Sequence, residues 1–301
     1  MINEIMNNGI FPKIKESSYH ALPRLSSSGM KMIIEDCPAA FRYAADHPER
    51  DDPSRDTEIG TAAHLLLLEP QSPRLVLIDA EDYRTKVAKE LRSDAYADGR
   101  SPILAPDMEK AKEMVTAFYR QAAPLPSDIA AEVSYLWTDP ETGTALKARP
   151  DGATGGMLID YKTTANAHPE AFARRVVDNG HHIQAAHYLA GHRVLTGRDA
   201  DWLWIVQSTK PPFLVSVHRP TQGTLQAGYE KVRAAIAIYN ACRDSGKWPG
   251  YEAPTPDGVW SLDLPVWAKF QHEERRERGD FLPPKKPSAA DLERAVRAQA
   301  P

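Results

Sequence analysis

The chain has 301 residues, of which 42% are hydrophobic and 26% are charged, a balance typical of a globular protein with one large or two small domains. Its net charge of −4 argues against a globally basic nucleic-acid-binding protein, although basic residues confined to one groove could still bind phosphates. No apolar run approaches the ~20 residues of a membrane span, and the N-terminus lacks a signal-peptide pattern. We therefore expect a cytoplasmic protein that does not bind membranes.

The first half of the chain contains several predicted helices. Residues 1–18 have no periodic pattern and are expected to be flexible. A helix is predicted over 26–46, capped by one of three serines and interrupted near Pro38. The next predicted elements are a buried helix over 59–69, a strand over 75–78, a helix over 83–91, and a helix that begins at a capping Asp107 and ends near Gln121.

The centre of the chain changes to an alternating pattern typical of strands. Three alternating segments, 131–139, 144–151 and 157–164, are separated by the turn sequences PETG and ATGG, which predicts an antiparallel meander over 132–163. The remaining predicted elements are helices over 169–180 and 182–197, strands over 200–208 and 213–219, and a helix over 224–244. This order predicts one α/β domain, residues 19–248, with a mixed β-sheet flanked by helices, followed by a proline- and charge-rich tail over 249–301.

Two aspartates and a lysine form the first candidate site. Asp160 and Lys162 are two residues apart on one predicted strand, so their side chains share a face. Asp151 ends the neighbouring strand, and adjacent strands lie ~4.8 Å apart. Two carboxylates at that separation repel each other unless a cation lies between them. Mg²⁺ prefers such oxygen ligands, and Lys162 could orient the attacking water or hold a phosphate oxygen.

Other polar residues could face the same place. Glu132 opens the first strand of the meander, and His64 lies among leucines, where an imidazole could complete a metal shell. Gln184 and Tyr188 are four apart and share a helix face, and Arg149 could bind a DNA phosphate. Each of these residues alone is equally compatible with an ordinary core or surface position. The prediction therefore depends on their joint occurrence in this order.

That order resembles the PD-(D/E)XK nuclease superfamily and, within it, the nuclease domain of RecE (exonuclease VIII) and related phage-type exonucleases. The resemblance is carried by five segments: 19–43, 60–70, 137–152, 158–174 and 181–192. It implies a restriction-endonuclease-like core in which His64, Asp151 and Asp160 are metal ligands and Lys162 is the catalytic lysine. It also implies that Glu132 is a supporting acid and that Gln184 and Tyr188 line the active site. Asp160 stands where the family usually has glutamate.

The resemblance also implies cofactors and partners. We expect Mg²⁺, with Mn²⁺ as a possible substitute. Some relatives carry an iron–sulfur cluster, and the Cys37-Pro38 pair is similar to their motif, but Cys242 is the only other cysteine, so no cluster is expected. Members of the group are ring-shaped oligomers, here a trimer or tetramer, that degrade the 5′ strand of double-stranded DNA ends and pass the 3′ strand to a RecT-like annealing protein.

Two alternatives remain open at this point. The first is a nuclease of the same superfamily that acts on single strands or flaps, or as an endonuclease. The second is a catalytically inert protein that binds DNA ends, which the acidic net charge does not exclude. The sequence does not determine the polarity or processivity of digestion, the oligomer size, the number of metal ions or the role of the tail.

Overall fold

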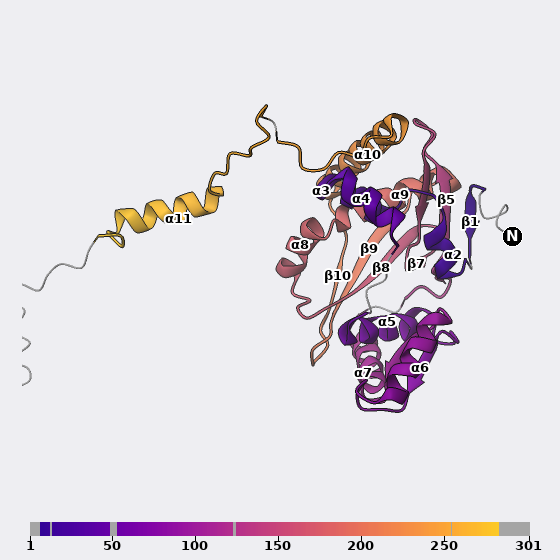
Figure 1. Ribbon diagram of the computed structural model, residues 1–301. Coiled ribbons are helices and arrows are strands. Elements are labelled where there is room, and N and C mark those ends of the chain that lie inside the picture. The colour runs from indigo at the N-terminus through magenta and orange to yellow at the C-terminus, as the bar shows by residue number, and fades with distance from the viewer. Residues whose placement is uncertain (1–6, 13, 49–52, 123–124, 254, 283–301) are drawn as a thin grey trace, which may run out of the picture. The chain divides into compact units, whose positions relative to one another are not determined.

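The computed structural model describes residues 7–12, 14–48, 53–122, 125–253 and 255–282, and the chain divides into two units, Met1–Gly250 and Tyr251–Pro301 (Figure 1). In the described part of the first unit, the helices are α2 (Glu16–Ala21), α3 (Ser27–Glu35), α4 (Pro38–Asp46), α5 (Arg55–Leu68), α6 (Lys86–Ala97), α7 (Ala105–Gln121), α8 (Pro169–Asp178), α9 (His181–Thr196) and α10 (Gln222–Ser245). Its strands are β1 (Gly9–Phe11), β2 (Leu75–Ile78), β3 (Ser101–Leu104), β4 (Ala130–Ala131), β5 (Ser134–Thr138), β6 (Ala145–Ala148), β7 (Gly152–Ala153), β8 (Met157–Thr164), β9 (Asp201–Ser208) and β10 (Val215–His218).

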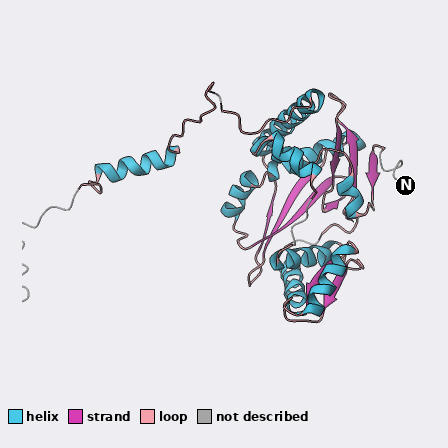
Figure 2. Cartoon of the chain, in the orientation of Figure 1, coloured by secondary structure: helices cyan, strands magenta, loops and turns pink. Residues whose placement is uncertain are grey.

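The largest sheet has five strands in the order β10-β9-β8-β7-β4. Figure 2 shows the strands of the first unit flanked by helices. Its two long strands, β8 and β9, are parallel, whereas every other neighbouring pair in it is antiparallel. A three-stranded sheet has the order β1-β5-β6, and β2 and β3 form a parallel pair. The predicted class, a mixed β-sheet flanked by helices, is confirmed.

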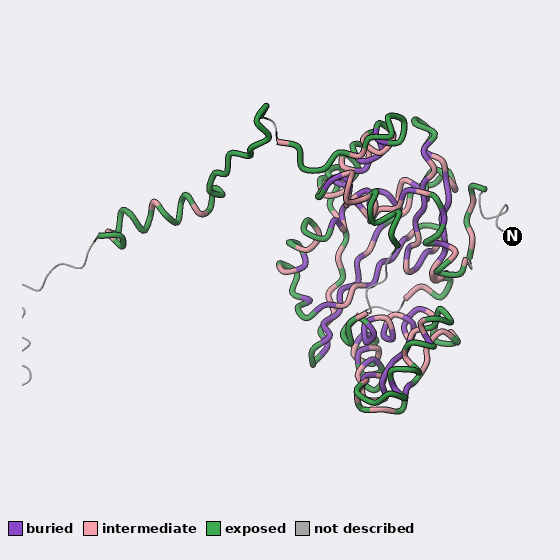
Figure 3. Tube along the Cα trace, in the orientation of Figure 1, coloured by how far each residue is buried: buried purple, intermediate pink, exposed green. Residues whose placement is uncertain are grey.

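The central strands β8 and β9 are covered on both faces, which is why they are almost entirely buried (Figure 3). Leu158 and Trp204 on one face pack into a core shared with α3, α9 and α10. Ile159 and Tyr161 on the opposite face pack into a second core with α5 and α7. Because successive side chains alternate, Asp160 points toward the α9 side of the sheet.

The N-terminal segment differs from the prediction of a flexible region over residues 1–18. Its described part contains β1, which pairs antiparallel with β5, and α2. Residues 1–6 and 13 lie outside the described part of the chain. A three-residue strand is held by backbone hydrogen bonds to a sheet edge, so its own side chains carry little periodic signal.

The predicted three-stranded meander is divided between two sheets. β5 pairs with β6 in one sheet, whereas β7 pairs with β8 in the other. The division falls at Pro150 and Asp151, between β6 and β7. Proline has no backbone N–H to contribute to a ladder, so it favours a strand boundary here.

Several helix boundaries test the predicted capping residues. Ser26 caps α3 by accepting a hydrogen bond from the backbone N–H of Gly29, and Pro38 opens α4, as predicted. The prediction that Asp107 caps a helix is wrong, because α7 begins at Ala105 and Asp107 instead forms an ion pair with Arg55 at 2.5 Å. In addition, α6 begins later than predicted, and β3 was not predicted.

Lys147 fixes the N-terminal segment to the sheet. Its side chain is 6% exposed, and its Nζ donates to the carbonyl oxygens of Tyr19, His20 and Leu22 at 2.9, 3.0 and 3.0 Å. These carbonyls lie in and just after the last turn of α2, where the helix itself supplies no donors. The buried ammonium group therefore terminates α2 and holds it in place.

We expect Lys147→Met to lower the free energy of unfolding by about 2–3 kcal/mol, because three buried carbonyls lose their donor. Urea denaturation measures this change, and hydrogen exchange should show loss of protection over 16–22. Lys86→Met, at a lysine whose side chain is 88% exposed, is the control and should change stability little. Equal stability of the two variants would contradict this role.

The second unit contains one described helix, α11 (Val266–Glu277). The sequence predicts a solvated tail over 249–301, and its large apolar side chains, including Trp260, Trp267 and Phe270, are indeed exposed. Residues 254 and 283–301 lie outside the described part of the chain. Among the described residues of both units, every helix is too short or too polar to cross a membrane.

Candidate metal and catalytic site

The helix α5 packs against the face of β8 that bears Ile159 and Tyr161, and it presents His64 beside that strand. The side chain of Ser54 caps this helix. Glu58 is buried and accepts hydrogen bonds from Tyr83 at 2.8 Å, Tyr96 at 2.8 Å and Arg92 at 2.7 Å. These bonds join α5 to the segment that contains α6, so the helix that presents His64 is held rigidly.

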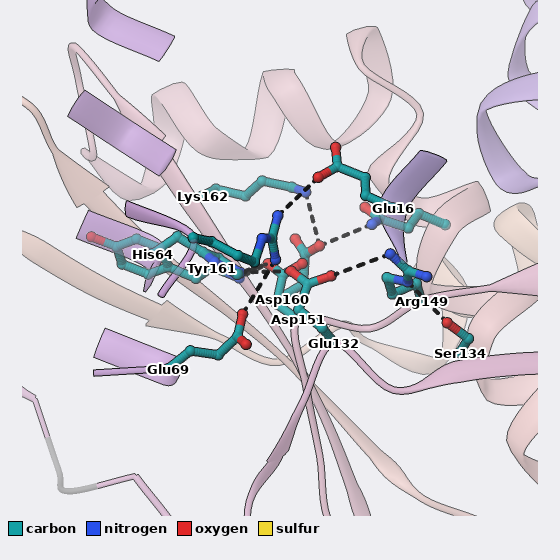
Figure 4. A network of polar contacts seen from close by, with 12 residues as sticks. Glu16, His64, Glu69, Glu132, Ser134, Arg149, Asp151, Asp160, Tyr161 and Lys162 are labelled. Atoms are coloured by element: carbon teal, nitrogen blue, oxygen red, sulfur yellow. Dashed lines mark hydrogen bonds and ion pairs between the residues drawn. The ribbon is translucent and has the colours of Figure 1, made fainter. Parts of the chain in front are cut away.

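Glu132 lies between β4 and β5 rather than within a strand. Its φ angle is 55°, a left-handed conformation that is uncommon for residues other than glycine. Its backbone N–H donates to the carbonyl oxygen of Asp151 at 3.1 Å, which joins the two chain segments that bear these acids. The irregular backbone brings the Glu132 carboxylate toward His64 (Figure 4).

His64, Glu132 and Asp151 form a group able to bind a metal ion. The Nε2 atom of His64 lies 3.6 Å from Glu132 Oε1 and 3.6 Å from Asp151 Oδ2, and the ligand atoms all lie within 4.8 Å of one another (Figure 4). The backbone N–H of Tyr161 donates to Asp151 Oδ2 at 2.8 Å, which fixes this carboxylate against β8.

The charges of this group shift its pKa values. Burial alone would lower the pKa of His64, but the neighbouring Asp151 and Glu132 carboxylates outweigh it, so the pKa is raised. Burial would raise the pKa of Asp151, but His64, Lys162 and the Tyr161 N–H lower it overall. The pKa of Glu132 is raised, mainly by burial. Two half-buried carboxylates beside an imidazole are an arrangement that a cation would stabilise.

Asp160 lies beside this group and is completely buried. Its Oδ1 accepts hydrogen bonds from Lys162 Nζ at 2.8 Å and from Gln184 Nε2 at 2.9 Å. Its Oδ2 is buried and has no hydrogen-bond partner among the described residues. Burial raises the pKa of Asp160 to about 6, the Asp151 charge adds to this increase, and Lys162 opposes it. An unpaired buried carboxylate oxygen is costly, and a ligand at this position would offset that cost.

The helix α9 covers Asp160 with two of the residues selected from the sequence. Gln184 contacts Asp160 directly, as above. Tyr188 follows one turn later, is buried, and packs edge-on against Trp202 with ring centroids 5.7 Å apart. Burial and the nearby Asp160 charge both raise the pKa of Tyr188, so its hydroxyl is neutral near pH 7.

Arg149 is held within the protein. Its guanidinium group donates to Ser134 Oγ at 3.0 Å and to the carbonyl oxygen of Ile14 at 2.9 Å, and it lies 4.0 Å from the ring centroid of Tyr19. It is also 3.9 Å from Glu132 Oε2, and its side chain is 10% exposed. These contacts position Glu132, and a direct contact between Arg149 and DNA stays a prediction.

Three charged residues near this site were not selected from the sequence. Arg74 binds Glu16 at 2.8 Å and Glu69 at 3.4 Å, and it thereby links α2 to the end of α5. The charges of Arg74 and Glu69 also act on Glu132 and His64 respectively. No local pattern joins these residues, because they come from three segments that meet only in the folded chain.

The fold and the site together define a mixed α/β domain with a partly buried cluster of carboxylates, an imidazole and a lysine beside its central strand β8. A family model for a PDDEXK-like domain of unknown function (DUF3799) matches residues 26–254, and the chain belongs to this family.

Comparison with solved structures gives a related fold. A protein from Eubacterium rectale, described as a "Putative exonuclease", is 14% identical, with a TM-score of 0.60 over 85% of this chain and 98% of its own. At that identity the match supports the fold alone. The structure of SSO0001 is 11% identical over 68% of this chain and 97% of its own, and its TM-score of 0.26 is too low to support any argument. The search of curated proteins found no match.

Proposed function

We propose that this protein is a divalent-metal-dependent nuclease that hydrolyses phosphodiester bonds of DNA. The observation that carries the proposal is the convergence of His64, Glu132 and Asp151, from separate segments, beside the Asp160–Lys162 pair. A surface cluster of acids would be solvated, whereas these groups are largely buried. The description of the chain's family as PDDEXK-like also supports the proposal.

The donor set fits Mg²⁺, with Mn²⁺ as a substitute. His64 offers one nitrogen, and Glu132 and Asp151 offer carboxylate oxygens. Asp160 offers another, its Oδ2, which is buried and has no hydrogen-bond partner within the described part of the chain. Mg²⁺ favours oxygen ligands, and Mn²⁺ also accepts an imidazole. When bound, the metal would supply Lewis-acid stabilisation of the phosphate and a water of lowered pKa.

The protein residues have separate roles in this proposal. Asp151 and Asp160 would hold the metal together with His64, and Glu132 would support the same site. Lys162 carries a fixed positive charge, because the Asp160 and Asp151 charges outweigh the effect of burial and raise its pKa. That ammonium group orients the nucleophile or stabilises the phosphate oxygens. Gln184 holds the Asp160 carboxylate in place, and Tyr188 lines the same side of the site.

We further propose that the substrate is a linear double-stranded DNA end whose 5′ strand is degraded. This part is supported by the sequence resemblance to the RecE group, and the fold resembles that of the Eubacterium rectale protein described as a "Putative exonuclease". The same resemblance supports a trimeric or tetrameric ring and a RecT-like annealing partner. Arg149 is included as a candidate DNA contact.

A nuclease assay on 5′- and 3′-labelled linear duplex tests this proposal. With Mg²⁺ we expect early release of the 5′ label, while the 3′ label stays attached to strands that shorten from their 5′ ends. EDTA should stop digestion, and covalently closed circular DNA should remain intact. Cutting of closed circles, or a preference for single strands or flaps, would favour the alternative nuclease classes. DNA-end binding without cleavage in any divalent metal would favour an inert end-binding protein.

A further inference from the structure

The helix α5 and the strand β8 touch at one glycine. A Cβ atom added to Gly60 would lie closer to Thr163 Oγ1 than the 3.0 Å that real Cβ atoms keep. The next nearest atoms of Thr163, Cβ and Cγ2, would be 3.5 and 3.6 Å away, which are ordinary contacts. The hydroxyl of Thr163 alone therefore occupies the space that a side chain at position 60 would need.

The contact between Gly60 and Thr163 lies one helical turn from His64 along α5 and two residues from Tyr161 along β8. Gly60 and His64 are four residues apart, so they share one face of α5 and are separated by about 6 Å along the helix. Thr163 and Tyr161 share one face of β8 and are separated by about 6.6 Å. Consistent with these matched spacings, the rings of His64 and Tyr161 lie 6.3 Å apart between centroids. The distance from α5 to β8 at Gly60 thus sets how closely His64 approaches Asp151, which the Tyr161 N–H holds.

Neither side of the contact can yield easily. The hydrogen bonds of Glu58 tie α5 to the residues around α6, so α5 cannot shift without the elements that hold it. On the other side, Thr163 belongs to a central strand and is paired in register with Gln207 of β9. An added methyl group at position 60 would therefore move the helix away from the sheet as a unit.

We propose that Gly60 is a positioning residue of the metal site. Its missing side chain lets α5 approach β8 closely enough for the His64 imidazole to meet Asp151 and Glu132. The proposal rests on the proposed function for its consequence, metal binding, but its geometry can be tested separately. Gly60 touches neither the metal nor the substrate in this account and acts only through the placement of His64.

Four variants test this role: Gly60→Ala, Thr163→Ala, the double variant, and the control Gly223→Ala. Gly223 also lies in a helix, α10, and a Cβ there would have its nearest neighbour at 3.9 Å. Calorimetric titration with Mn²⁺ should give a dissociation constant raised at least ~10-fold in Gly60→Ala, as for other residues that orient metal ligands. The Mn²⁺ dissociation constant of the double variant should return toward that of Thr163→Ala, because removal of the Thr163 hydroxyl leaves only ordinary contacts around the added Cβ.

Crystal structures of the wild type and Gly60→Ala give a readout that does not depend on metal binding. We expect the 3.6 Å separation between His64 Nε2 and Asp151 Oδ2 to increase in the variant and to recover in the double variant. An unchanged separation together with unchanged Mn²⁺ affinity in Gly60→Ala would overturn the proposal. Loss of affinity that Thr163→Ala fails to rescue would also overturn it.

Stability separates positioning from a general packing defect. Alanine is a better helix former than glycine, and this preference offsets part of the strain at position 60. The thermal midpoint of Gly60→Ala should therefore fall only slightly, although its affinity for Mn²⁺ falls at least ~10-fold. If Gly60→Ala does not fold, recovery of folding and of the His64–Asp151 separation in the double variant supports the proposal, and failure to recover contradicts it. A wild type that binds no Mn²⁺ would refute the proposed function, while the crystallographic separation would still decide the role of Gly60.

Discussion

Asp151→Asn is expected to reduce metal-dependent DNA cleavage by at least ~10³-fold in kcat/KM, about 4 kcal/mol of transition-state stabilisation. The Asp151 carboxylate is the member of the cluster that contacts His64 and also accepts the Tyr161 N–H. Asparagine keeps an oxygen for the Tyr161 N–H but removes the charge that a metal requires. The fold should persist, and calorimetry with Mn²⁺ should show loss of specific binding.

The matched control for this variant is Asp199→Asn. The side chain of Asp199 is 81% exposed and pairs only with Arg193 among the contacts described here. Its cleavage rate and Mn²⁺ affinity should equal those of the wild type. If Asp151→Asn binds Mn²⁺ and degrades linear duplex at the wild-type rate, the proposed metal site is wrong.

Lys162→Met is expected to slow the chemical step while leaving Mn²⁺ binding intact, unlike Asp151→Asn. We expect kcat to fall about 10²- to 10⁴-fold, the range typical of a positioned proton-transfer or charge-stabilising group. The affinity for DNA in Ca²⁺ should change much less, because Lys162 is partly buried and paired with Asp160 at 2.8 Å, and it is one charge among the many that contact a DNA backbone. Methionine keeps most of the volume of lysine, so the change isolates the ammonium group.

Lys86→Met serves as the control for this substitution, because the Lys86 side chain is 88% exposed. Single-turnover assays at saturating enzyme separate the chemical step from DNA binding. Mn²⁺ binding should survive in Lys162→Met and be lost in Asp151→Asn, so the two variants distinguish the catalytic lysine from a metal ligand. A Lys162→Met protein with normal single-turnover rates would exclude the ammonium group from catalysis.

Much of the central sheet could be predicted because its signals are local. The alternating pattern of 157–164 determines that Asp160 and Lys162 share a face, and the structure joins them by a 2.8 Å hydrogen bond. The spacing of Gln184 and Tyr188 determines that they lie on one side of α9, which covers Asp160. Serine at position 26 and proline at position 38 set helix starts for steric and hydrogen-bonding reasons that act within a few residues.

The prediction failed where a side chain or strand depends on a distant partner. Asp107 is a good capping residue by composition, but Arg55, 52 positions away, binds its carboxylate. β1 exists because the edge of β5 accepts it, although residues 9–11 alone have no strand pattern. Glu132 was placed at the start of a strand, whereas its left-handed backbone conformation follows from the hydrogen bond to Asp151 across the junction of two sheets.

By itself, the sequence determined which residue types the chain supplies and how neighbours within one helix or strand are oriented, because backbone geometry fixes those directions over a few residues. Only the tertiary structure decided that the His64 imidazole lies 3.6 Å from both Glu132 and Asp151, and that Arg149 and Arg74 are each tied to neighbouring groups. Those distances depend on how α5 packs against β8 and how two sheets meet near Pro150. Such packing is a balance of contacts between segments far apart in the chain, and no local pattern encodes it.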